Sequence, residues 1–283
     1  MISAHRYFND PLDRITEADE ASFFAGIKLA NRTFKTTESG RMSELDSIMV
    51  HLAKDRGWSS PMVLDLAVSS GVTTRDLQQA MNVSGLQPSI VATDIAIRAN
   101  IVELAPGIRV LIDSSARPLQ FEFLRLGLRV WNRRLDYVTG YWIVTWLARQ
   151  LASGVSSAGG QEVKLVSRRA TRSDENFEIL EDDLAVINRS FQKRFDIVRA
   201  ANILNRGYFE PAKLLAMIDN IKAYARGPGT LVMVNRTHND GTNHGTVFEL
   251  SRDNALRVVK RIGAGSEIEE LLGTIAIGTK PSM

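Results

Sequence analysis

The chain has 283 residues, of which 44% are hydrophobic and 24% are charged, an ordinary composition for a globular protein. Its formal net charge is only +3, too even a balance to indicate nucleic-acid binding, although the sequence pI is about 9.2. The absence of cysteine excludes disulfides, thiolate nucleophiles and zinc–cysteine sites, and it agrees with a reducing compartment.

Neither a secretory signal nor a membrane span is expected. Residues 1–14 mix acidic and basic side chains and lack an apolar core. The most hydrophobic segment, Tyr137 to Ala152, is interrupted by Arg149 and Gln150 and is shorter than the ~20 apolar residues that cross a bilayer. We therefore expect a soluble, cytoplasmic protein.

The first 58 residues carry apolar side chains at helical spacing, as at Leu45 and Met49. Ser43 suits the start of a helix and Gly57 its end. This pattern predicts two or three helices, which we interpret as an N-terminal helical cap over residues 1–58.

From Pro61 onward, short apolar runs alternate with helical segments, which is typical of a parallel α/β sheet. The predicted strands cover residues 62–68, 89–95, 108–112, 162–167, 177–182, 195–200 and 230–235. The predicted helices cover residues 73–81, the segment from the second strand to about Leu104, and 210–226. Two further strands, 246–250 and 255–262, are expected at an antiparallel edge. The predicted fold is a Rossmann-like α/β domain over residues 59–283.

Residues 116–160 interrupt this alternation with an aromatic-rich stretch that we expect to be a helical insertion. It contains Trp131, Trp142 and Trp146 and ends in a Gly/Ser-rich linker, residues 153–160.

The segment from Met62 to Gly71 begins with an apolar strand that contains an acidic residue and ends in a tight turn of small residues. A helix-forming segment follows the turn. A second apolar run then ends in Asp94. A βαβ unit binds a nucleoside-like cofactor in this way, with the turn approaching the ligand and the second acid holding ribose hydroxyls. The turn is not of the phosphate-cradling type, so the ligand need not carry a pyrophosphate.

The turn sequence Asp65-Leu-Ala-Val-Ser-Ser-Gly71 resembles the first motif of class I S-adenosylmethionine-dependent methyltransferases. This resemblance implies S-adenosylmethionine as cofactor. Asp65 would hold the turn amides or the cofactor's amino group, Gly71 would allow close backbone approach, and Asp94 would accept both ribose hydroxyls. The alternative is that these acids only cap strand ends or helix starts. The expected cofactor contacts here are Asp65, Ala67, Ser69, Gly71, Asp94 and Ile95.

A pair of acids follows the apolar run 177–180. Asp182 or Asp183 would accept a hydrogen bond from the adenine amino group, and Leu184 would pack on the ring. The alternative is again a capping role.

The segment from Phe195 to Phe209 resembles motif IV of class I enzymes and is similar to that region of chemoreceptor glutamate methyltransferases. This similarity implies that Ala201, Asn202 and Ile203 lie against the cofactor, with Tyr208 near the transferred methyl group. The chain departs from that family at Ala201, where an arginine usually precedes the asparagine.

The loop after the strand 230–235 contains His238, Asp240 and His244. Histidine titrates near neutrality, so this loop is a candidate for a general base or for substrate contacts. The alternatives are a metal site, which would need a third ligand, and a polar hairpin with Asn-Asp-Gly turn chemistry. Arg236 is a candidate anchor for an anionic substrate group, or else part of a surface ion pair. We expect no metal.

Aromatic residues recur at helical spacing in the insertion, among them Trp142 and Trp146. Such stripes usually belong to a core, but this one is also a candidate substrate channel or a surface that touches lipid. The arginines just upstream are typical of the alternative, a basic amphipathic helix at a membrane interface.

These observations predict a methyltransferase acting on a small-molecule, saccharide or lipid-linked acceptor, with oxygen as the expected methylated atom. A base is needed only where the acceptor must lose a proton, and His244, His238 and Tyr208 are its candidates. The alternatives are a protein glutamate carboxyl methyltransferase and a non-catalytic cofactor-binding module. No nucleic-acid partner is expected, peripheral membrane contact stays open, and the sequence does not determine the oligomeric state.

Overall fold

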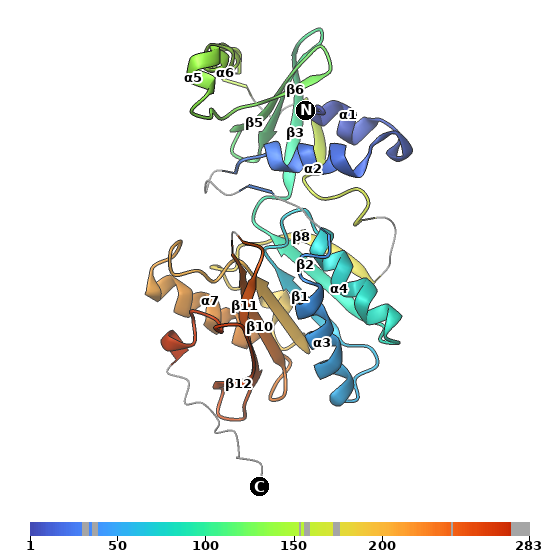
Figure 1. Cartoon of the computed structure of the whole chain (residues 1–283), viewed down its shortest axis with the longest axis vertical. Helices are drawn as coiled ribbons and strands as arrows, with labels where there is room; N and C mark the ends of the chain where they lie inside the picture. The colour runs from blue at the N-terminus through green and yellow to red at the C-terminus, as the bar shows by residue number, and fades with distance from the viewer. Residues whose placement is uncertain are drawn as a thin grey trace. The chain divides into compact units, whose positions relative to one another are not determined.

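The computed structural model describes residues 1–29, 34–35, 39–152, 154–155, 159–171, 176–238 and 240–272. The chain forms two compact units (Figure 1). Unit 1 comprises Met1–Glu38, Ser69–Val72 and Ala96–Arg172, and unit 2 comprises Ser39–Val68, Thr73–Ile95 and Ser173–Met283. None of the helices in the described ranges has the length and hydrophobicity needed to cross a bilayer.

Within its described residues, unit 2 contains a seven-stranded sheet in the order β12-β11-β10-β9-β1-β2-β8. Five neighbouring strands are parallel: β1 (Met62–Leu66), β2 (Ser89–Asp94), β8 (Phe177–Glu181), β9 (Ile197–Ala201) and β10 (Leu231–Thr237). Two antiparallel strands complete the sheet, β11 (Asn243–Leu250) and β12 (Leu256–Ile262). The predicted Rossmann-like sheet with antiparallel C-terminal strands is confirmed.

Helices cover both faces of this sheet (Figure 1). On one face lie α3 (Ser43–Asp55) and α4 (Val72–Val83), and on the other lies α7 (Pro211–Tyr224). Each helix presents an apolar stripe at i, i+3 and i+4 spacing, which is why it packs on a sheet rather than standing in water. Short 3₁₀ turns at Arg189–Phe191 (η2) and Glu270–Leu272 (η3) belong to the same unit.

The described part of unit 1 is built on a five-stranded antiparallel sheet in the order β6-β5-β4-β3-β7. Its strands are β3 (Arg98–Ala105), β4 (Ile108–Asp113), β5 (Pro118–Phe123), β6 (Leu126–Arg129) and β7 (Gln161–Lys164). One apolar core joins this sheet to α1 (Ala4–Asn9), η1 (Leu12–Arg14) and α2 (Glu17–Gly26). A second core includes Ala148 of α6 (Tyr141–Leu151), and the short helix α5 (Asp136–Thr139) precedes α6.

Several expectations about the elements and their grouping are wrong. The predicted strands 108–112 and 162–167 belong to the antiparallel sheet of unit 1 and not to the Rossmann-like sheet, so the predicted domain 59–283 is interrupted by Ala96–Arg172. The predicted helix up to Leu104 is the strand β3, and the first part of the predicted helical insertion 116–160 is the hairpin β5–β6. The helices of residues 1–58 also do not form one cap, because α3 packs in the core of unit 2 while α1 and α2 belong to unit 1. The predicted linker lies partly outside the described residues, at 153 and 156–158.

The strand β5 buries two polar side chains alongside two apolar ones, Leu119 and Phe121. Gln120 accepts a hydrogen bond from the Ala4 amide at 2.6 Å and donates one to the Ile2 carbonyl at 3.1 Å. Buried Glu122 pairs with Arg109 at 2.8 Å. The run Leu119-Gln120-Phe121-Glu122-Phe123 alternates apolar and polar residues as a strand does, but both of its polar side chains are buried through partners that only the fold brings near.

Candidate functional site

The parallel strands of unit 2 end at one edge of its sheet. If the parallel strands are numbered 1 to 5 along the chain, their spatial order in the sheet is 3-2-1-4-5. The direction of this order reverses between β1 and β9. Ligands of open α/β sheets bind outside the carboxyl ends of the strands at such a switch point, where the connections diverge and leave a crevice. The residues that follow Leu66 and Ala201 therefore border the expected ligand position.

Non-glycine residues directly after β1 and β9 adopt left-handed backbone at this switch point. Ala67, after β1, has φ = 57°, and Asn202, after β9, has φ = 61°. This conformation costs of order 1–2 kcal/mol for a residue with a Cβ atom, so neighbours must hold it in place. The Val68 amide donates to the Thr93 carbonyl at 3.0 Å, and the Asn202 amide donates to the Asn235 carbonyl at 2.8 Å. Such maintained strain is typical of functional sites.

The other two predicted turn residues, Ser69 and Gly71, belong to unit 1. Both have positive φ angles, 57° and 81°. Within unit 1, the buried ammonium group of Lys35 donates to the Ser69 carbonyl at 2.9 Å, and the Ser167 amide donates to the Ser70 carbonyl at 2.8 Å. These contacts fix the carbonyl groups of the turn.

Asp65 is buried and already engaged. Its Oδ1 accepts from Arg199 Nε at 2.9 Å, and its Oδ2 accepts from Arg199 Nη2 at 2.5 Å and from Thr74 Oγ1 at 2.6 Å. The two residues face each other across β1 and β9 and are 2% and 1% exposed. Asp65 therefore anchors β1 to β9 below the turn, which argues against its predicted direct contact with a cofactor.

The same guanidinium group also holds Asp46 of α3, with Arg199 Nη1 2.7 Å from Asp46 Oδ1. Burial raises the pKa of Asp46 to about 7, helped by the nearby carboxylates of Asp65 and Asp76 and opposed by Arg199. One buried cation thus serves two buried carboxyl groups. Arg199 and Asp46 were not among the predicted site residues, although an arginine inside the apolar run of β9 is a visible signal.

Asp94 and Asp182 end neighbouring strands. The Asp182 amide donates to the Asp94 carbonyl at 3.1 Å, and Asp94 is 7% exposed. Asp182 Oδ1 accepts from Asn188 Nδ2 at 2.8 Å, whereas its buried Oδ2 has no hydrogen-bond partner among the described residues. Burial raises the pKa of Asp182. Ile95 follows with a half-exposed side chain, so acidic oxygens and an apolar surface lie together at this edge.

The remaining predicted residues of this region have local partners. Asp183 is exposed, and its Oδ1 accepts from the Ala185 amide at 3.0 Å in an Asx turn. Leu184 is 5% exposed and packs in the core with Leu66 and Phe191, so its predicted stacking on a ring would require it to leave that core.

The segment that resembles motif IV begins in β9 and continues beyond its carboxyl end. The Asn202 side chain accepts from the Thr237 amide at 2.7 Å and thereby ties the end of β9 to the end of β10. Ala201 and Ile203 are partly buried against opposite faces of the sheet. Tyr208 is 64% exposed.

Asn235, which sequence reasoning missed as a site residue, ends the buried part of β10. It is 3% exposed, and neither its Oδ1 nor its Nδ2 has a hydrogen-bond partner among the described residues. It sits opposite Gly245 of β11, where a Cβ atom would lie 2.6 Å from the Cβ of Asn235. An unpaired buried amide costs about 1–3 kcal/mol, so its retention indicates a ligand or a bound water.

The histidine loop is a β-hairpin turn between β10 and β11. His238 and His244 lie side by side with ring centroids 4.5 Å apart. Hydrogen bonds from Thr242 hold Asp240 and lower its pKa. No group of three metal-ligating side chains occurs in the described part of the chain. Arg236 pairs with Glu267 at 3.2 Å, as the ion-pair alternative predicts.

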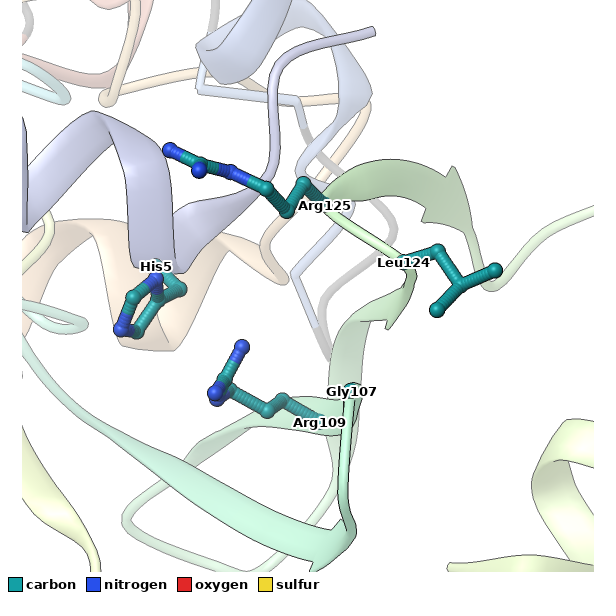
Figure 2. A pocket seen from close by; sticks show the side chains of 5 residues that line it. All are labelled: His5, Gly107, Arg109, Leu124 and Arg125. Atoms are coloured by element: carbon teal, nitrogen blue, oxygen red, sulfur yellow. The ribbon is translucent and has the colours of Figure 1, made fainter.

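The predicted substrate residues Trp142 and Trp146 lie on α6 of unit 1 and are 41% and 53% exposed. Unit 1 also has an open hollow of about 400 Å³, lined by His5, Gly107, Arg109, Leu124 and Arg125 (Figure 2). Its arginines already have partners, because Arg109 pairs with Glu122 and Arg125 pairs with Asp10. The hollow contains none of the predicted site residues.

No protein-family model matches the chain, and no curated protein sequence matches it. Among solved structures, it is similar to the N-methyltransferase NodS from Bradyrhizobium japonicum WM9 in complex with S-adenosyl-L-homocysteine. The two are 12% identical with a TM-score of 0.37, and the alignment covers 77% of this chain and 73% of that one.

Two further similar structures are methyltransferases. A putative S-adenosyl-L-methionine-dependent methyltransferase from Methanococcus maripaludis is 9% identical with a TM-score of 0.32, and 72% of this chain aligns with 59% of that one. CalS10, an amino pentose methyltransferase from Micromonospora echinaspora, is 10% identical with a TM-score of 0.34, and 76% of this chain aligns with 65% of that one. This chain thus spans less than two thirds of both proteins, and at these TM-scores the alignments assign it no function.

Proposed function

We propose that this chain is an S-adenosylmethionine-dependent methyltransferase whose cofactor lies over the carboxyl ends of β1, β2 and β9. The observation that carries the proposal is the switch point, where left-handed Ala67 and Asn202 follow β1 and β9 and Asp94 ends the next strand. The acceptor we propose is a small molecule, a saccharide or a lipid-linked compound methylated on oxygen. We place the reaction in the cytoplasm, in keeping with the cysteine-free sequence.

The acceptor groups and the apolar surface at this edge fit such a cofactor. A carboxylate offers two acceptor oxygens, so Asp94 suits the two hydroxyls of a ribose. Asp182 Oδ2, buried and without a partner among the described residues, suits an adenine amino group. The exposed side chain of Ile95 offers apolar surface to the ring. In this scheme Asp65 shapes the turn through Arg199 instead of touching the ligand.

When bound, S-adenosylmethionine supplies a methyl group on a sulfonium that needs no further activation. The protein then has to hold the acceptor in line with that methyl group, and this positioning alone can provide much of the rate enhancement of the transfer. An oxygen acceptor also has to lose a proton. His244 or its neighbour His238 is the base we propose, because a neutral imidazole accepts a proton near neutral pH, and exposed Tyr208 is the alternative.

Calorimetric titration of the full chain with S-adenosyl-L-homocysteine tests the cofactor assignment. We expect one-site binding that weakens by about 1–3 kcal/mol in Asp94→Ala, since removing a charged acceptor leaves the ribose hydroxyls without a partner. Asp183→Ala is the matched control, because its carboxylate caps an exposed turn, and it should bind like the wild type. Absence of binding to the wild type, or equal affinity in Asp94→Ala, would contradict the proposal.

Transfer of a labelled methyl group identifies the acceptor class. Label recovered in a small-molecule or lipid fraction, stable to mild base, agrees with the proposal. Label on protein that mild base releases would instead identify a carboxyl methyltransferase. Cofactor binding without transfer to any fraction would identify a cofactor-binding module.

A further inference from the structure

The helix α6 of unit 1 is unusually apolar on the side that faces water. Of its eleven residues, only Thr145 is buried. The exposed apolar residues, which we call the α6 apolar face, are Trp142, Ile143, Val144, Trp146, Leu147 and Leu151, each 41–62% exposed. Soluble proteins rarely leave such a continuous apolar surface in water, and where they do it usually marks a binding surface.

The exposure follows from how the helix is attached. Its inner stripe consists of small residues, Thr145, Ala148 and the following Ala152, which recur on successive turns and approach the second core of unit 1. Thr145 Oγ1 donates to Asn132 Oδ1 at 2.9 Å, and Tyr141 Oη donates to the Arg129 carbonyl at 3.1 Å. The small side chains thus hold the helix to the unit, while the large apolar ones point outward.

The preceding turn extends the same surface. Leu135, Tyr137 and Val138, in and before α5, are 65–85% exposed. Tyrosine and tryptophan are the side chains that favour the boundary between apolar chains and water, because each has an apolar body and a polar tip. This composition therefore fits a lipid interface better than a dry protein core.

In the described part of residues 121–160, the exposed charged side chains are all positive. The acidic residues between positions 121 and 160 are Glu122 and Asp136, and both are buried in pairs with arginines. The exposed charged residues of the described part of this segment are Arg125, Arg133, Arg134 and Arg149. A second copy meeting this surface would bring arginines against arginines, whereas an anionic phosphate layer would neutralise them.

We propose that the α6 apolar face, with Arg133 and Arg134 beside it, docks on the surface of an anionic lipid bilayer. The tryptophans and aliphatic side chains enter the boundary between headgroups and acyl chains, and the arginines lie at the level of the lipid phosphates. The helix is too short to cross a bilayer, so it lies in the plane of the interface.

Co-sedimentation of the full chain with vesicles tests this proposal. We expect the chain to bind phosphatidylcholine vesicles that contain about one third phosphatidylglycerol, to bind pure phosphatidylcholine far more weakly, and to be released by added salt. Tryptophan fluorescence should shift to shorter wavelength on binding. No sedimentation with the anionic vesicles, or equal sedimentation with both kinds, would overturn the proposal.

Matched variants separate the apolar and the charged contributions. Trp142→Ser/Trp146→Ser should lose binding and the fluorescence shift, while Val83→Ser/Val259→Ser, exposed apolar positions in unit 2, should retain both. Arg133→Gln/Arg134→Gln should weaken binding on the order of tenfold or more, and Arg252→Gln/Lys260→Gln, which removes the same charge in unit 2, should not. Vesicle binding that is unchanged in both the tryptophan variant and the Arg133→Gln/Arg134→Gln variant would overturn the proposal. So would a wild-type chain that does not bind vesicles but forms oligomers that the tryptophan variant abolishes.

Discussion

At the scale of single residues, Arg199 is the largest fully buried side chain in the described part of the chain. It is 1% exposed and serves Asp65 of β1 and Asp46 of α3 together, and it also donates to the Thr73 carbonyl at 3.0 Å. Although burial disfavours its charged form, the two carboxyl groups raise the pKa of Arg199. The guanidinium fork is what lets one residue bond three groups at once.

Replacing Arg199 by Met should therefore destabilise the chain strongly. The change leaves Asp65 and Asp46 buried without their cation, and breaking a buried pair in this way costs about 3–5 kcal/mol. Urea unfolding measures the loss. The control is Arg257→Met, which removes an exposed partner of Asp253 and should change stability little. Equal losses of unfolding free energy in the two variants would show that the buried network does not contribute to stability.

A second prediction at the scale of single residues concerns Asn235. Because its carboxamide has no partner among the described residues, Asn235→Leu should leave the unfolding free energy of the ligand-free chain unchanged or raised. The same variant should weaken binding of the cofactor or acceptor, measured by calorimetry. If Asn235→Leu unfolds readily without ligand, the amide is bonded within the protein and is not a ligand group.

At the scale of elements, the docking of α3 on the sheet has a titratable contact. The pKa of Asp46 is raised by burial from 3.8 to about 7, so the folded chain binds this proton more tightly than the unfolded chain does. As pH rises from about 4 to 7, the unfolded carboxyl ionises first, and stability must fall through this group. Above about pH 7 Asp46 is ionised in both states, and the loss of stability from this group has reached its full value.

We therefore expect Asp46→Asn to flatten the pH dependence of stability between about pH 4 and 7. Chemical unfolding curves of the wild type and the variant at several pH values measure it. Asp55→Asn, at the exposed end of the same helix, is the control that should follow the wild-type slope. A variant whose stability falls as steeply as that of the wild type would assign the slope to other groups.

The elements show what the sequence can and cannot predict. The parallel strands of unit 2 were predictable because each is a short apolar run bounded by turns, and the ends of those runs located Asp94 and Asn202. The burial of polar residues on β5 was not predictable, since Gln120 and Glu122 are buried through partners that only the fold brings near. The role of Asp65 depended on Arg199, 134 positions away.

At the scale of the whole molecule, the chain combines two units with different surfaces. Unit 2 has the parallel sheet and the proposed cofactor site, whereas unit 1 has the exposed α6 apolar face. The two proposals are independent, since one rests on strand ends and the other on an exposed helix. A methyltransferase with a lipid-linked acceptor would use both.

The measurement that tests the central claim most directly is a crystal structure of the full chain with S-adenosyl-L-homocysteine. We predict electron density for the ligand outside the carboxyl ends of β1 and β9, with both ribose hydroxyls within hydrogen-bond distance of Asp94 and the adenine amino group toward Asp182. Density at any other place on the chain, or a ribose that does not contact Asp94, would contradict this account.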